Sequence, residues 1–203
     1  MKEIIIKTIK YACVGLLVLT IFCVGIFVHD ITSGDMTSKK YITKIIRENK
    51  EIINAAVYTI YSSNIVGIYD TKDRELPEGA GDIEGKYVVI DTGERNEYLE
   101  PTYIYEPLTD EYLIAMLNID KLKSVGIDGA IINLYFGGRG IAPSGVCSGV
   151  YYFPNDDIKD AKSKYKEEFE QSGEGWLCKP KSGYDSLYVE RICDNLWYYE
   201  EKW

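Results

Sequence analysis

The sequence predicts an α+β protein, with a single N-terminal transmembrane helix followed by one domain in which helices pack on an antiparallel β-sheet. Three observations indicate this class. Residues 11–28 carry no charged side chain. Beyond them, segments with helical spacing of apolar residues alternate with short β-branched and aromatic runs. The roughly 170 residues after residue 30 are enough for one domain with its own core.

The apolar run has the length of a membrane-spanning helix, because eighteen residues at about 1.5 Å per residue cover roughly 27 Å. Basic flanks tend to stay in the cytoplasm. The run follows three lysines: Lys2, Lys7 and Lys10. This predicts four parts: a cytoplasmic N-terminus (1–10), the transmembrane helix (11–28), a hinge (29–38) and an extracytoplasmic α+β domain (39–203). A cleaved signal peptide is the alternative, although its apolar region is usually about 7–15 residues long.

The first half of the domain begins with an amphipathic helix. Apolar residues recur every three or four positions from Lys39 to Val57, and Ser38 or Asp35 supplies the N-cap. A second helix runs from an acidic cap at Asp110 to Gly126, or is split near Asn118. Between the two helices, strands are expected at Ile65–Tyr69, at Lys86–Ile90 and, as an edge strand, at Tyr103–Tyr105.

The second half is predicted to begin with a hairpin formed by Ala130–Phe136 and Val146–Phe153, joined by a loop at 137–145. A helix from Pro154 to Phe169 follows, with lysines and acids on its outer side. The C-terminus returns to strands, with a tight turn at 194–195. These strands are Trp176–Lys179, Leu187–Ile192 and Leu196–Glu200.

Charge and cysteines limit the chemistry of the domain. Residues 31–203 carry 20 basic and 30 acidic side chains, a formal charge of −10, which argues against nucleic-acid binding. The spacing of Cys178 and Cys193 favours a disulfide that closes a loop of about 15 residues and contributes roughly 3 kcal/mol. Free buried thiols are the open alternative. Three cysteines without a nearby histidine make a poor zinc site, so no metal and no cofactor is predicted.

Histidine is almost absent, because His29 at the membrane boundary is the only one. The sequence therefore rules out a Ser–His–Asp triad and an HExxH zinc site in the domain, and we assign no catalytic residue. The GGRG segment at 137–140 lacks the Gly-Lys-Ser/Thr ending of a phosphate loop. Arg139 at its tip is a candidate contact for an anionic ligand. Trp197 and Tyr199 are candidate aromatic ligand contacts, with cross-strand packing as the alternative interpretation.

Together these features predict a non-catalytic binding or envelope-associated domain on a single-pass cell-membrane protein, with its C-terminal domain outside. The expected partners are the membrane and a protein or glycan at the cell surface. An acid/base enzyme acting on surface glycan through two carboxylates is an alternative. The order of parts, with an apolar helix, a helix on a sheet and late cysteines, is similar to the general plan of pilins and pseudopilins. This resemblance implies pilin-like assembly as a further alternative.

Overall fold

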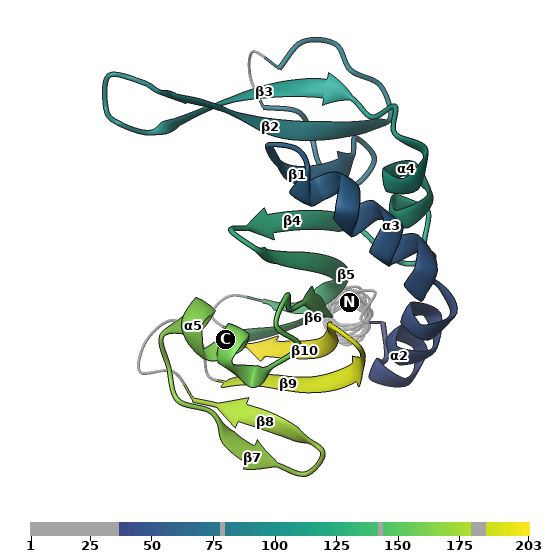
Figure 1. Ribbon diagram of the computed structural model, residues 1–203, viewed down its shortest axis with the longest axis vertical. Coiled ribbons are helices and arrows are strands. Elements are labelled where there is room, and N and C mark those ends of the chain that lie inside the picture. The colour runs from purple at the N-terminus through teal and green to yellow at the C-terminus, as the bar shows by residue number, and fades with distance from the viewer. Residues whose placement is uncertain (1–36, 78–79, 142–143, 180–185) are drawn as a thin grey trace, which may run out of the picture.

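Ten antiparallel strands form one continuous sheet in the computed structural model, which describes residues 37–77, 80–141, 144–179 and 186–203. Across the sheet the strands follow the order β3 (Pro101–Pro107), β2 (Lys86–Arg95), β1 (Ile65–Asp70), β4 (Ser124–Asp128), β5 (Ile131–Ile141), β6 (Ser144–Tyr152), β10 (Leu196–Lys202), β9 (Ser186–Cys193), β8 (Gly175–Cys178) and β7 (Glu170–Ser172). Most neighbouring strands are consecutive in the chain, and the pairs β1–β4 and β6–β10 join three smaller groups. Figure 1 shows the strands stacked along the long axis, with the β2–β3 hairpin at one end and β7–β8 at the other.

The predicted fold class is wrong in adding a membrane-spanning helix to the fold. The described chain is a single antiparallel sheet with four short helices of 7 to 12 residues. No helix among these residues is both long and apolar enough to cross a membrane. The segment 11–28, on which that prediction rested, lies outside the described residues. The membrane-protein classification made from the sequence is therefore unsupported by the described part of the chain.

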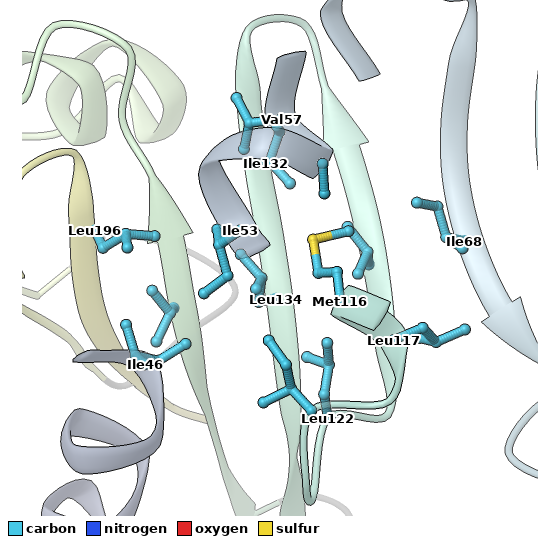
Figure 2. Packing of buried hydrophobic residues seen from close by; sticks show 14 of the residues in the cluster. Ile46, Ile53, Val57, Ile68, Met116, Leu117, Leu122, Ile132, Leu134 and Leu196 are labelled. Atoms are coloured by element: carbon cyan, nitrogen blue, oxygen red, sulfur yellow. The ribbon is translucent and has the colours of Figure 1, made fainter. Parts of the chain in front are cut away.

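Three helices cover one face of the sheet: α2 (Lys39–Glu48), α3 (Lys50–Tyr61) and α4 (Glu111–Leu117). Their apolar sides form the larger core with the strands, and Figure 2 shows Ile53 beside Leu134 and Val57 beside Ile132. Burying an aliphatic side chain of this size contributes roughly 1.5–3 kcal/mol. The apolar side chains of the amphipathic helix α2 therefore hold it on the sheet.

A second, smaller core lies on the opposite face, beneath α5 (Ile158–Tyr165). Successive side chains of a strand point to opposite faces, so Tyr198 joins the larger core while Trp197 and Tyr199 join the smaller one. Helices therefore cover both faces of the sheet, with α5 on the face opposite α2, α3 and α4. The members of the second core are Cys147, Tyr151, Phe153, Ala161, Phe169, Cys178, Leu187, Val189, Trp197 and Tyr199.

Several predicted elements are confirmed, including the edge strand around Tyr103–Tyr105, the hairpin of β5 and β6, and the turn at 194–195. The long first helix is instead two helices. Asn49 interrupts it, because its backbone leaves helical geometry and its side-chain Nδ2 donates to the carbonyl of Ile45 at 2.8 Å.

Three other predicted boundaries are wrong. The helix expected to reach Gly126 ends at Leu117, because residues 124–128 pair with β1 and β5 as a strand. The loop expected at 137–145 is largely strand, since β5 continues to Ile141. The helix expected to reach Phe169 ends at Tyr165, where Lys166 takes a left-handed backbone conformation (φ 55°) before the unpredicted strand β7.

Candidate functional site

The three residues predicted to contact a ligand do not form one site. Arg139 is exposed on β5 opposite Val146. Trp197 and Tyr199 are 6% and 1% exposed in the second core, and the Tyr199 ring stacks on Tyr151 at 4.2 Å. The alternative interpretation of these two aromatic residues, packing between strands, is therefore the correct one.

The predicted bridge partners, Cys178 and Cys193, are free thiols. Cys178 belongs to the second core, whereas Cys193 packs against the helix-side core on the other face. Cys178 pairs with Leu187, six residues before Cys193 on β9, which is about 20 Å along a strand. Because a disulfide needs Cα atoms within about 7 Å, the fold does not bring these thiols together.

A carboxylate fixes the turn between β9 and β10. Asp156 Oδ1 accepts a hydrogen bond from the indole Nε1 of Trp197 at 3.0 Å and from the backbone N–H of Asn195 at 2.9 Å. Its Oδ2 is bound by the Arg191 guanidinium, and this bond lowers the pKa of Asp156 from its ordinary value. The arrangement ties the segment before α5 to the last hairpin.

Glu201 accepts hydrogen bonds from three side chains of the second core. The Tyr151 hydroxyl donates to its Oε1 at 3.1 Å, the Tyr165 hydroxyl donates to the same atom, and the Cys147 thiol donates to its Oε2 at 3.5 Å. Burial raises the pKa of Cys147 to about 12 and that of Tyr151 well above its ordinary value. A thiol must ionise to act as a nucleophile. At neutral pH this cluster therefore holds α5 on the sheet instead of supplying a reactive group.

Four tyrosines line a hollow of about 260 Å³ on the other face of β1–β3. The register places Tyr69 opposite Tyr87, with ring centroids 5.5 Å apart, and the rings of Tyr87 and Tyr105 lie 6.3 Å apart. Tyr103 precedes Tyr105 by two residues and lines the same hollow with an exposed fraction of 44%.

None of the four described helices covers these tyrosines. Ile68 and Val88, the neighbours of Tyr69 and Tyr87 in the chain, belong to the core beneath α2, α3 and α4, so the tyrosines point to the opposite face. The remaining helix, α5, packs on the second core at the far end of the sheet. This leaves the sheet face over β1–β3 without a helix on it, with Tyr103 exposed, Tyr69 and Tyr105 half-buried, and Tyr87 buried among its neighbours at 1% exposure.

The loop after β1 brings a cation to this hollow. The Arg74 guanidinium lies 4.4 Å from the centroid of the Tyr69 ring, a cation–π contact. Burial raises the pKa of Tyr87, and the Arg74 charge opposes that rise. The acids before it in the loop, Asp70 and Asp73, are paired with lysines. In the part of the chain that the structure describes, Arg74 has no carboxylate partner.

A second hollow of about 390 Å³ continues the first, since Val66 and Ile127 line both. It reaches the end of α3 and includes the carboxylate of Asp91, four residues beyond Tyr87 on β2. We call the two hollows together the tyrosine groove. Tyr87, beside the Arg74 end, and Asp91, at the other end, are separated by about 13 Å along the strand, and Asp91 is paired with Arg95 at 3.3 Å.

The described carboxyl groups do not suggest acid catalysis. A general acid needs a raised pKa near neutrality. Instead, a hydrogen bond from the Lys72 backbone lowers the pKa of Asp70, and a hydrogen bond from Lys50 lowers that of Asp194. Across the described ranges, no three His, Cys, Asp or Glu side chains are grouped so that they could hold a metal ion.

No protein-family model, curated protein or solved structure matches this chain. The sequence alone did not predict the groove. Tyr69, Tyr87 and Tyr105 are 18 residues apart on three strands, and only the pairing of those strands brings them together. The one sequence signal is the alternation Tyr103–Ile104–Tyr105 on an edge strand, which places two aromatic side chains on one face.

Proposed function

We propose that this chain is a non-catalytic binding domain whose tyrosine groove takes an extended, proline-containing segment of a partner protein. One observation carries the proposal: a sheet face without a covering helix carries four tyrosines around a hollow, beside an arginine that has no carboxylate partner among the described residues. Tyr103 is 44% exposed and Tyr69 and Tyr105 are half-buried, whereas Tyr87 is buried beneath them, and none of the four belongs to either core cluster. Location outside the cytoplasm stays a prediction.

The shape and charge of the groove favour such a segment. Proline-rich peptides adopt an extended helix of about 3.1 Å per residue and dock into aromatic-lined grooves with little loss of entropy. About four residues span the 13 Å between the two ends of the groove. Arg74 suits an acidic side chain in the bound segment, because its planar guanidinium binds carboxylates with two parallel hydrogen bonds.

The test is a titration of the full chain into a fluorescent decapeptide of prolines with two glutamates. We expect Tyr103→Ala and Arg74→Gln each to weaken binding about tenfold, a loss of about 1.4 kcal/mol. Tyr58→Ala is the matched control, since Tyr58 is 79% exposed on α3 and lines neither hollow. A second peptide with lysines in place of the glutamates should bind more weakly, because it presents no anion to Arg74.

Equal affinity of the wild type and both groove variants for the glutamate peptide would refute the proposal. Chitotetraose is the competing probe. If the chain binds this oligosaccharide, loses that binding in Tyr103→Ala and ignores both peptides, the groove is a glycan site and the peptide proposal is wrong.

A further inference from the structure

We propose that two copies of this chain pair edge to edge through β3, in an antiparallel register centred on Ile104. β3 is the outermost strand of the sheet, so one of its sides is not paired with a described strand. Five of its seven residues are exposed, and the strand contains no lysine that would discourage pairing. The register shift of the β2–β3 ladder falls in β2, between Asp91 and Arg95. This proposal is separate from the peptide-binding function.

The sequence of β3 is nearly symmetric about Ile104. It reads Pro-Thr-Tyr-Ile-Tyr-Glu-Pro, with prolines at both ends and a tyrosine on each side of the central isoleucine. An interface between identical chains around a two-fold axis must be self-complementary. With Ile104 on the axis, Tyr103 faces Tyr105 of the second copy and Thr102 faces Glu106, so no like charges within the strand oppose each other.

The backbone of β3 is oriented for this register. The backbone N–H of Leu108 donates to the carbonyl of Lys86 at 2.9 Å, and the hydroxyl of Thr92 donates to the carbonyl of Thr102. Because the alternation has a period of two, the even-numbered residues of β3 face β2, and Tyr103 and Tyr105 direct their N–H and C=O groups outward. Pairing Tyr103 with Tyr105 in both directions forms four backbone hydrogen bonds.

The two prolines fit the same alternation. Pro101 and Pro107 are odd-numbered, so their nitrogens, which carry no hydrogen, lie on the outer side, where strand prolines are tolerated. They also end the ladder after the two tyrosine pairs. The contact is thereby limited to the centre of β3.

The side chain at this centre is apolar and exposed. Ile104 is 44% exposed beside Ile90, which packs against the helix-side core, so two facing isoleucines extend that core across the axis. The pairing would bury apolar surface of Ile104 that is exposed in the single chain.

The size of the contact indicates a weak dimer. β3 supplies seven residues from each copy, well below the roughly 20–30 of a standard interface, so we expect a dissociation constant of about micromolar or weaker. At the opposite edge of the sheet, β7 has the polar sequence Glu-Gln-Ser. If only β3 pairs, each copy has one edge for association, so the assembly stops at a dimer.

The experiment is disulfide trapping in the full chain. Ile104→Cys places the two new thiols on the axis, with Cα atoms about 4.5 Å apart, within the range of a disulfide. Thr102→Cys is the matched control, because its two copies lie about 13 Å apart along the strand. The wild-type chain sets the background from the native cysteines. After mild oxidation, we expect a covalent dimer for Ile104→Cys at least fivefold above both the control and the wild type.

Sedimentation velocity supplies the second measurement. Ile104→Lys should weaken self-association at least tenfold, whereas Tyr58→Lys, at an exposed site on α3, should leave it unchanged. If Ile104→Cys traps no more dimer than Thr102→Cys while its circular dichroism matches the wild type, the proposal is wrong. Preferential trapping by Tyr103→Cys would overturn the register, because Tyr103 faces itself only when the strand is shifted.

Discussion

Replacing Asp156 by alanine should destabilise the fold by about 2–4 kcal/mol. The substitution removes the acceptor of two N–H donors, the indole of Trp197, which is 6% exposed, and the backbone of Asn195. A buried donor left without a partner costs about 1–3 kcal/mol. The third donor, Arg191, is half-exposed and keeps its contact with Asp194, so it adds little.

Asp156→Asn separates these contributions. Both N–H donors bind Oδ1, which asparagine retains. Oδ2, which accepts from both Nε and a terminal nitrogen of Arg191, becomes an amide nitrogen, so only the Arg191 Nε contact with Oδ1 remains. The loss of stability in Asp156→Asn should therefore be a small fraction of the loss in Asp156→Ala. Urea unfolding of both variants and the wild type at pH 7 measures the difference, with Glu97→Ala on the exposed hairpin tip as the control.

The pH dependence gives the sign of the charge effect. The pKa of Asp156 is lower in the folded protein than its ordinary value of 3.8. Its charge therefore stabilises the fold fully above about pH 4 and loses that contribution as the pH falls through the folded-state pKa. The stability gap between wild type and Asp156→Asn should close over that range. A gap that stays constant down to pH 2.5, or equal losses for the two variants at pH 7, would refute this reasoning.

Two further predictions test the cores. Ile53→Ala should cost about 2–5 kcal/mol in urea unfolding, because Ile53 is fully buried between α3 and the sheet and truncation leaves a cavity; a loss below 1 kcal/mol would contradict this packing. Cys147 should react with a maleimide at pH 8 only after unfolding, since burial raises its thiol pKa to about 12. Peptide mass spectrometry distinguishes it from the half-buried Cys193, and rapid labelling of native Cys147 would exclude the buried, protonated state.

Sequence patterns predicted the strands well where β-branched and aromatic residues were concentrated, as in β1, β6 and β9. They failed where tertiary pairing overrides local preference. Residues 124–126 were assigned to the end of a helix because Val125 continued an apolar stripe, but they belong to the strand β4 between β1 and β5. The glycines at 137–140 suggested a loop, and the structure uses them in a strand.

The candidate site was harder to predict, because it depends on register. Of the aromatic residues near the C-terminus, Trp197 and Tyr199 are buried beneath α5, whereas Tyr198 lies in the helix-side core. The aromatic face without a helix is formed by Tyr69, Tyr87 and Tyr105, which only strand pairing brings together. Tyrosine content alone does not distinguish the two faces, since packing against a helix decides which one stays open.

The contact of α2 with the last strands has a consequence for synthesis on the ribosome. Ile42 and Ile46 of α2 pack in the same core as Leu196 of β10. From Ile46 to Leu196 the chain is 150 residues long. Because synthesis adds about 5–20 residues per second, roughly 8–30 s pass before β10 is made and can cover the apolar side of α2. During that interval the nascent chain exposes the apolar surface of α2, which can bind other polypeptides. The yield of folded protein in cells should therefore depend on chaperones that bind exposed apolar segments.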